Sequence, residues 1–441
     1  IRDKEKDTIT VIEEIYPEYE FWKVCRELNL MDVDTDVFYR PFHTLSNGEQ
    51  TKVMLAVLFS KDNNFLLIDE PTNHLDMEAR QMIKEYLNKK KGFILVSHDK
   101  DFLDGCIDHV LVINKTNIEV QQGTFSSWWE NKKRQDEYEM SENDRLKKDI
   151  KRLKESARRT KDWADEVEST KIGVKSLKHE KNIDTRAYIG EKSRRMQKRR
   201  KNLENRQDKS IEEKEKLLKN IEKSESLKLY PLTHHKNTIV TMEDVSISYG
   251  DHKVTNHFNL KINNGDRLIL QGKNGCGKSS ILKAIIKTAG SEHILYSDIE
   301  SEYNLQIYGK IELASGLIIS YCPQDTSYLK GSLQSYIAKR QLDETLFKTI
   351  LSKLDFSRVQ FEKQMEEYSG GQKKKVLIAA SLCEKAHLYL WDEPLNFIDI
   401  FSRIQIEELL KEYHPTMIMV EHDISFVNKI ATDVIHFEQG C

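Results

Sequence analysis

The sequence has little cysteine, and its cysteines are not paired along the chain. Six cysteines are scattered over 441 residues and none forms a C-x-x-C pair, which argues against a zinc site and against a redox motif. No apolar run approaches the roughly 18 to 20 residues that cross a bilayer, and the N-terminus shows no secretory signal. These absences predict a protein of the reducing cytoplasm without a transmembrane segment.

Net charge is also small, but it is unevenly distributed. The whole chain carries −3. Residues 131–230 hold 31 Lys and Arg against 21 Asp and Glu, whereas the remainder holds 38 against 51. An acidic body therefore carries a basic middle segment, which predicts a polyanionic partner for that segment.

One glycine-rich stretch predicts nucleotide chemistry. Residues 272–279 read G-x-x-x-x-G-K-S, the phosphate-binding loop of nucleotide-hydrolysing enzymes. The apolar run 267–270 predicts a strand before the loop, and residues 279–287 predict a helix that stops near Gly290. Backbone N–H groups in such a loop can hold a polyphosphate at the positive end of the helix dipole.

Individual residues of the loop have separate predicted tasks. Gly275 and Gly277 let the backbone approach closely without steric cost. Lys278 can reach the β- and γ-phosphates, and the Ser279 hydroxyl can hold Mg²⁺. A disulfide at Cys276 would obstruct this function. The predicted nucleotide-binding residues of this stretch are Gly272, Lys273, Asn274, Gly275, Cys276, Gly277, Lys278, Ser279 and Ser280.

Three further motifs occur twice in the same order. Each copy has a serine-glycine motif before an apolar helix, an apolar strand ending in Asp-Glu-Pro, and a second apolar strand followed by a histidine. The residues are Ser46, Asp69 and His98 in the first copy and Ser369, Asp392 and His422 in the second. Serine and aspartate are 23 residues apart in both copies, and aspartate and histidine are 29 and 30 apart. This conserved register indicates an internal duplication.

These motifs resemble the signature, Walker B, D-loop and switch-histidine motifs of ABC ATPase domains, over residues 40–105 and 240–425. The resemblance implies an α/β fold with two ABC-type P-loop ATPase domains that stack head to tail, so that each ATP site is composite. Lys278 lies 91 residues before Ser369, but only 45 residues precede Ser46. Nothing in residues 1–45 resembles a phosphate loop, so we expect the front of the first domain to be missing from this sequence.

The resemblance also implies residue roles. Asp392 is an oxygen ligand suited to Mg²⁺, Glu393 orients and polarises the attacking water, and His422 contacts the γ-phosphate. Catalysis of this kind is mostly positioning and charge neutralisation. The metal ligands are predicted to be Ser279, Gln324 and Asp392, the catalytic residues Glu393, His422 and Lys278, and the remaining nucleotide contacts Tyr249, Gln324, Ser46, Gly48 and Gln50.

The second composite site is predicted to be incomplete, because it has no phosphate loop in this sequence. Its residues are Asp69, Glu70, His98, Ser369, Gly370 and Gly371. We expect one ATP per chain.

The middle segment predicts an antiparallel α-helical hairpin, which gives domains at 1–130, 131–235 and 236–441. From Asn131 to about Asp165 the composition is helical, without Pro or Gly, and a second run of helical composition extends from about Arg186 to Leu227. Apolar residues at coiled-coil spacing are Leu146, Ile150, Leu153 and Ala157 in the first run and Ile211, Leu218 and Ile221 in the second. Arms of roughly 35 to 40 residues would be about 50 to 60 Å long.

The hairpin is most basic in its distal half. Residues 171–200 hold 11 Lys and Arg against 3 Asp and Glu. Such charges bind the nucleic-acid backbone without reading its sequence. The predicted RNA-binding residues are Arg194, Arg195, Lys198, Arg199 and Arg200.

Two ABC domains joined by a charged hairpin, with no membrane span, resemble the ABC-F family. The segment Gly123–Trp128 and the first signature motif also fit it. The long hairpin and the sequence ending at Asp399 resemble the antibiotic-resistance ribosomal protection branch, of the Lsa or Vga type, although Leu395 and Phe397 depart from the first copy. This implies an ATP-bound protein on the ribosome, whose hairpin tip, within Trp163–Tyr188, contacts rRNA and tRNA and helps dislodge lincosamide, pleuromutilin or streptogramin A drugs. No obligate oligomer is expected.

Three other interpretations remain open. The ATPase subunit of a drug exporter fits the duplicated motifs but does not need a basic hairpin. A DNA-repair or chromosome ATPase usually has its coiled coil between phosphate loop and signature, whereas Lys278 to Ser369 is uninterrupted here. The third is a non-resistance ABC-F translation factor, which the sequence distinguishes only weakly from the resistance branch.

Overall fold

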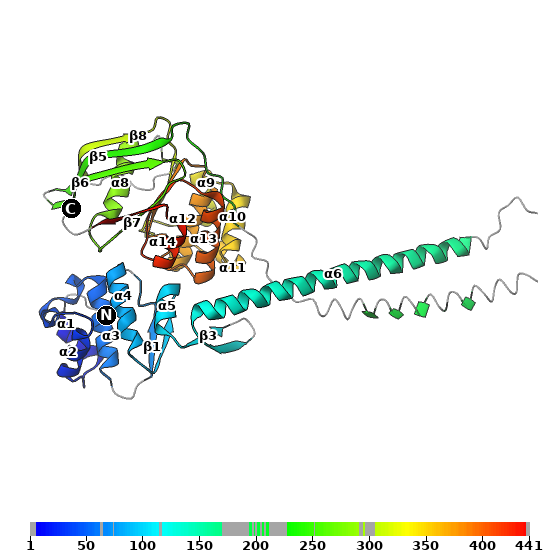
Figure 1. The fold of residues 1–441 in the computed structure, drawn as a ribbon, viewed down its shortest axis with the longest axis horizontal. Helices are drawn as coiled ribbons and strands as arrows, with labels where there is room; N and C mark the ends of the chain where they lie inside the picture. The colour runs from blue at the N-terminus through cyan, green and yellow to red at the C-terminus, as the bar shows by residue number, and fades with distance from the viewer. Residues whose placement is uncertain are drawn as a thin grey trace, which may run out of the picture. The chain divides into compact units, whose positions relative to one another are not determined.

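The computed structural model divides into two compact units, Ile1–Ser126 with Ser224–Cys441, and Ser127–Lys223. Within the first unit we call residues 1–126 the first domain and residues 224–441 the second domain (Figure 1). The structure describes residues 6–61, 65–73, 75–113, 117–169, 194–195, 198, 201–202, 205–206, 209–210, 227–250, 252–290, 294–295 and 305–437.

The second domain is built on a parallel sheet with strand order β12-β7-β11-β10-β9. These strands are β7 (Arg267–Gly272), β9 (Ile319–Cys322), β10 (Leu388–Asp392), β11 (Met417–Val420) and β12 (Asp433–Phe437). Every residue of β9, β10 and β11 is buried, as expected of parallel strands covered on both faces. The predicted strands on either side of the functional motifs are therefore present.

Two hydrophobic cores cover the two faces of this sheet. One contains Leu390, Ile418 and Val420 and is closed by α8 and an antiparallel sheet of order β6-β5-β8. The other contains Tyr389 and Trp391 and is closed by further helices. The elements are β5 (Thr238–Tyr249), β6 (His252–Asn263), α8 (Lys278–Ala289), β8 (Leu305–Leu313), α9 (Leu333–Arg340), α10 (Glu344–Lys353), α11 (Arg358–Phe361), η3 (Met365–Glu367), α12 (Gly370–Cys383), α13 (Ile400–Tyr413) and α14 (Ile424–Ile430).

The first domain begins with helices. Its elements are α1 (Thr8–Ile15), α2 (Phe21–Asn29), η1 (Thr35–Tyr39), η2 (Phe42–Thr44), α3 (Asn47–Phe59), β1 (Leu66–Asp69), α4 (Met77–Asn88), β2 (Phe93–Val96), α5 (Lys100–Cys106), β3 (His109–Ile113) and β4 (Ile118–Gln122). β1 pairs with β2 in parallel, and β3 with β4 antiparallel.

The β1–β2 sheet is covered on one face, in contrast to its counterpart in the second domain. Ile68 is buried in the single core of the first domain. On the other face, Leu67 is 73% exposed, Ile94 41% and Val96 49%. In the described part of the first domain, the duplication therefore repeats the strands and their register but not the second core.

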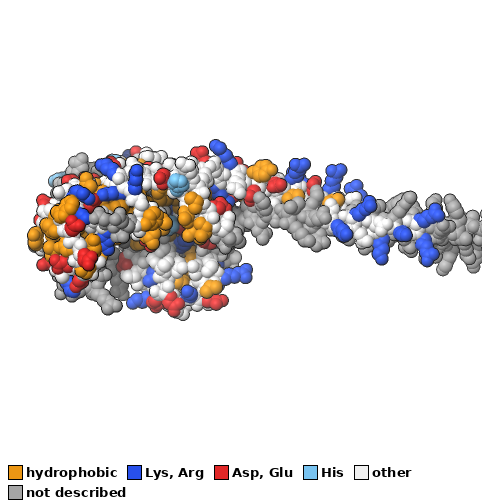
Figure 2. All heavy atoms as spheres, turned by 90° about the horizontal axis from the view of Figure 1, so that it is seen from below, with side chains coloured by type: hydrophobic (Ala, Val, Ile, Leu, Met, Phe, Trp, Pro, Cys, Tyr) orange, Lys and Arg blue, Asp and Glu red, His pale blue; other side chains and the backbone are white. Residues whose placement is uncertain are grey.

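The second unit contains α6 (Phe125–Ser169), a helix of 45 residues. At about 1.5 Å per residue it is roughly 68 Å long, longer than the predicted arm. Ile150 is buried and Leu146 and Leu153 are half-buried, in agreement with the predicted seam, and Lys and Arg side chains are distributed along the unit (Figure 2). The second seam and most of the predicted tip lie outside the described residues. Among the described helices, none has the length and apolarity needed to cross a bilayer.

Candidate ATP site between the two domains

The phosphate loop connects β7 to α8 with a left-handed turn at its end. Gly277 caps α8 with φ +99°, and a Cβ there would lie 2.6 Å from Val254 Cγ1 and 2.7 Å from Thr255 Cγ2. Gly275 also has positive φ, but a Cβ there would meet nothing within 4 Å. Close packing therefore requires glycine at Gly277, whereas backbone conformation favours it at both positions.

Lys278 is buried and folds back over the loop. Its ammonium donates hydrogen bonds to the carbonyl oxygens of Gly272 and Lys273, both at 2.8 Å. These bonds hold the charge where the predicted polyphosphate would lie.

Two oxygen donors meet at the start of α8. Ser279 Oγ donates to Asp392 Oδ1 at 2.9 Å, and Asp392 lies at the end of β10. Burial, together with the charge of Glu393, raises the pKa of Asp392 to about 6. A hydroxyl beside a buried carboxylate suits a hard cation such as Mg²⁺, whose charge would favour the ionised acid.

The predicted catalytic Glu393 is held by two amides. Gln324 Nε2 and Asn396 Nδ2 both donate to Glu393 Oε2, at 2.7 and 2.6 Å. Glu393 has φ +47°, a conformation that non-glycine residues rarely adopt. Gln324, predicted as a metal ligand, is thus placed on the glutamate instead of on Ser279 and Asp392.

The predicted switch histidine is deeply buried. His422 is 3% exposed, and its Nε2 lies 3.9 Å from Glu393 Oε1. Burial, followed by the charges of Lys278 and Arg80, lowers the pKa of His422 to about 3. The imidazole is therefore neutral at physiological pH.

Residues of both domains line a cleft of about 570 Å³ at the phosphate loop. Ser46 lines it from the first domain, and Tyr249 lines it from the second, with its hydroxyl 3.3 Å from Ser280 Oγ. Predicted residues that line the cleft are Ser46, Tyr249, Asn274, Gly275, Gly277, Lys278, Ser279, Ser280, Gln324 and Glu393.

Gly48 and Gln50, also predicted to contact nucleotide, do not line this cleft. Gln50 Nε2 donates to the carbonyl oxygens of Phe42 and Leu45, both at 3.0 Å, so it supports the turn that carries Ser46. The Ser46 side chain caps α3 in a capping box with Glu49. The N-terminus of α3, with its partial positive charge, begins at the cleft.

The D-loop of the first domain contacts the phosphate loop directly. Asp76 Oδ2 accepts a hydrogen bond from the Asn274 backbone N–H at 3.3 Å, and Lys273 forms an ion pair with Glu78 at 2.8 Å. Both first-domain residues lie at the start of α4, which Asp76 caps.

The residues of the second composite site repeat this geometry in part. Glu70 follows β1 with φ +47°, and His98 Nε2 lies 3.5 Å from its Oε1. Burial raises the pKa of Glu70 to about 7, although the Arg403 charge opposes the shift. Asp69 ends β1, Ser369 caps α12, and Gly370 and Gly371 form its first turn. A Cβ on Gly371 would lie 2.4 Å from the Phe397 carbonyl oxygen.

Two buried residues of the site were missed by the sequence predictions. Lys374 Nζ donates to the carbonyl oxygens of Pro323 and Asp392, at 2.8 and 3.2 Å, and joins two motif loops. The position equivalent to Lys374 in the first copy is Thr51. Comparison of the two copies therefore could not identify this lysine. Asn396 recurs as Asn73, and that repetition could have identified it.

The predicted RNA-binding residues are described in part. Arg194, Arg195 and Lys198 are helical and exposed. Arg199 and Arg200 lie outside the described residues, as does most of the predicted second arm of the hairpin.

Comparison with known families agrees with this geometry. Residues 2–73 and 255–396 match the sequence profile of the family described as ABC transporter. Two segments of the chain, one on each side of α6, therefore match ABC-type domains, and the α/β fold agrees with that match. The solved structure of RNase-L Inhibitor covers 99% of this chain and 69% of its own, with a TM-score of 0.57 at 19% identity, a likeness of fold.

Relatives of known sequence support the resemblance to ABC-F ATPases. YdiF of Bacillus subtilis is 27% identical over 409 residues, which cover 90% of this chain and 56% of YdiF. Ribosome protection protein VmlR of the same organism is 26% identical over 407 residues, 88% of this chain and 68% of VmlR. ABC transporter F family member 5 of Arabidopsis thaliana is 26% identical over 425 residues, 95% of this chain and 54% of that protein. The chain thus spans little more than half the length of two of these relatives.

Proposed function

We propose that this chain binds and hydrolyses ATP with Mg²⁺ in the cleft between its two ABC domains. The cleft itself is the observation that carries the proposal. It places the phosphate loop and Glu393 of the second domain opposite Ser46 of the first. Residues of the phosphate loop, the proposed catalytic glutamate and a signature serine therefore line one volume.

Each group has a task that its contacts support. The Lys278 ammonium would bind the terminal phosphates, and Ser279 and Asp392 would hold Mg²⁺, which would supply positive charge there. Glu393, held by Gln324 and Asn396, orients the attacking water. The neutral His422 donates an N–H to the terminal phosphate. The N-terminus of α3 adds its dipole from the other domain.

We also propose that residues 1–441, which contain one phosphate-loop motif, bind one ATP tightly. Asp69, Glu70 and His98 form the first-domain half of the other site, but residues 1–45 contain no phosphate-loop motif. Equilibrium titration with a fluorescent nucleotide should give one site. Two sites of comparable affinity would contradict the proposal.

The partner that we propose is the ribosome, bound through the basic segment of unit Ser127–Lys223. Three observations support it: the excess of Lys and Arg in residues 131–230, the exposure of Arg194 and Arg195, and the similarity to VmlR, named a ribosome protection protein. The finer proposal is protection against drugs of the peptidyl transferase centre, in the manner of the Lsa and Vga branch, in the cytoplasm.

Co-sedimentation with bacterial ribosomes tests the partner. Glu393→Gln should slow hydrolysis and hold the ATP-bound state, so the variant should pellet with ribosomes in ATP but not in its absence. Glu70→Gln is the matched control, because it makes the same change in the other copy and should not trap the complex. Neutralising Arg194, Arg195, Arg199 and Arg200 together should weaken pelleting.

The remaining outcomes separate the alternatives. ATP hydrolysis without ribosome binding in any variant would favour the drug-exporter interpretation. Ribosome binding without a change in the minimal inhibitory concentrations of lincosamides or pleuromutilins would favour a non-resistance translation factor.

A further inference from the structure

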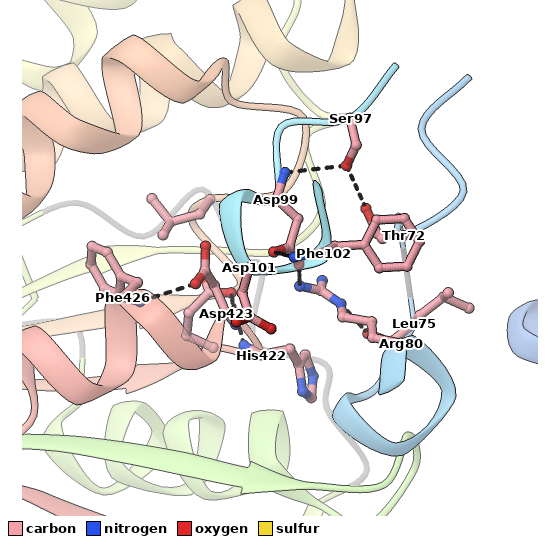
Figure 3. A network of polar contacts seen from close by, with 12 residues as sticks. Thr72, Leu75, Arg80, Ser97, Asp99, Asp101, Phe102, His422, Asp423 and Phe426 are labelled. Atoms are coloured by element: carbon pink, nitrogen blue, oxygen red, sulfur yellow. Dashed lines mark hydrogen bonds and ion pairs between the residues drawn. The ribbon is translucent and has the colours of Figure 1, made fainter. Parts of the chain in front are cut away.

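A buried arginine of the first domain lies against the switch histidine of the second. Arg80 is on α4, one turn after Asp76, and is 9% exposed. It lines a cavity of about 10 Å³ with Phe102, and His422 closes that cavity from the other domain. Figure 3 shows the His422 imidazole beside the Arg80 side chain.

The contacts of Arg80 join two loops of its own domain. Its Nε donates to the Leu75 carbonyl oxygen at 3.1 Å, and its Nη1 donates to Asp99 Oδ2 at 3.0 Å. Asp99 in turn caps α5 by accepting from the Phe102 N–H at 3.0 Å. Leu75 precedes Asp76, which contacts the phosphate loop of the second domain. Arg80 therefore connects the Asp76 loop, which contacts the phosphate loop, to the cavity that His422 also lines.

The same arrangement occurs in the second copy. Arg403 lies four residues after Asp399, as Arg80 lies four after Asp76. Its Nε donates to the Ile398 carbonyl oxygen at 2.9 Å, and its Nη1 contacts Asp423 Oδ2 at 3.4 Å. Arg80 is buried and Arg403 is half-buried, and charged groups withdrawn from water are costly unless they are paired and hydrogen-bonded. Because these arginines recur at matching positions with matching contacts, the arrangement belongs to the duplicated fold and not to one copy.

His422 has no polar anchor of its own. In the described part of the chain, neither of its ring nitrogens has a hydrogen-bond partner. Its orientation consequently depends on the side chains around the ring, and Arg80 lines the same small cavity as the ring.

We propose that Arg80 is a positioning residue for the ATP site of the second domain: from across the interface it holds the His422 ring and couples it to the Asp76 loop at the phosphates. Domain closure would then complete the site in two ways, by bringing Ser46 to the nucleotide and by fixing the histidine. The kinetic consequence rests on the proposed hydrolysis, whereas the effect on the ring does not.

The ring can be examined without any enzymatic activity. We would record imidazole resonances of the full chain and assign His422 by its loss in His422→Asn. Arg80→Met keeps the length of the side chain but removes the charge and the hydrogen bonds. Lys84→Met is the control, one turn further along α4, where the lysine pairs with Asp101 at 2.7 Å. The His422 resonance should shift or broaden in Arg80→Met and not in Lys84→Met. An equal response, or none in either variant, would overturn the proposal.

A double-mutant cycle tests the kinetic consequence. Arg80→Met should lower kcat between about 10- and 100-fold, the cost of misplacing a reacting group, with ATP Kd changed less than about threefold. In a His422→Ala background the same change should have little further effect, because interacting residues are not additive. Full additivity, or a loss confined to ATP affinity and thermal stability, would show a merely structural role. If the unmodified chain does not hydrolyse ATP, the proposed function fails, and the resonance measurement still decides the role of Arg80.

Discussion

Two leucines at equivalent places in the duplicated strands should respond very differently to the same substitution. Leu67 pairs with Ile94 in the first domain, and Leu390 pairs with Ile418 in the second, in the same register. Leu67 is 73% exposed and Leu390 is fully buried. Leu→Ala costs about 2 to 5 kcal/mol in a core but about 0.5 kcal/mol or less at the surface. For a domain of this size we expect Leu390→Ala to lower the Tm by about 4 to 20 °C and Leu67→Ala by about 2 °C or less.

Calorimetry of both variants measures the difference, and hydrogen exchange of peptides from β1 and β10 assigns each loss to its domain. Ile68→Ala is the internal control, because Ile68 neighbours Leu67 but faces the core. It should destabilise the first domain. If Leu67→Ala costs as much as Leu390→Ala, the outer face of β1–β2 is covered in solution and the reasoning from exposure is refuted.

Two further predictions concern pH and the phosphate loop. Burial would raise the pKa of Glu27, but hydrogen bonds led by that from Lys90 outweigh it and hold the pKa below its usual value of 4.5. A depressed pKa stabilises the folded state above the unfolded pKa, and that contribution is lost as pH falls through the folded pKa. Glu27→Gln should therefore remove this loss of stability at low pH. At neutral pH it should lower the free energy of unfolding by about 3 kcal/mol, because Lys90 loses its partner. Urea unfolding from pH 7 to 3 measures both effects, and an unchanged dependence of the unfolding free energy on pH would contradict the assignment. Gly275→Ala should cost about 1 kcal/mol of unfolding free energy for its positive φ, and Gly277→Ala about 1 to 3 kcal/mol more, because its methyl group would overlap Val254; equal melting temperatures of the two variants would argue against that packing.

Features that depend on residues close together in the sequence could be predicted. The helix predicted after the phosphate loop, over residues 279–287 with a stop near Gly290, is present as Lys278–Ala289. Features that depend on a bond between distant segments could not be predicted. Lys374 and Arg80 are buried cations whose carbonyl and carboxylate partners lie on other loops, and no local periodicity predicts such a contact. Only the tertiary fold reveals why charged residues are retained there.

The two copies of the ABC motifs therefore differ less in their own residues than in what surrounds them. The switch-histidine side chain is 3% exposed at His422 but 34% exposed at His98. The preceding residue is Glu421 in one copy and Ser97 in the other. Glu421 is fully buried and accepts hydrogen bonds from two backbone N–H groups of the switch loop, a role that the shorter Ser97 performs with one. Equal motifs thus stand in unequal surroundings, because neighbouring side chains bury the ring of His422 whereas that of His98 is one-third exposed.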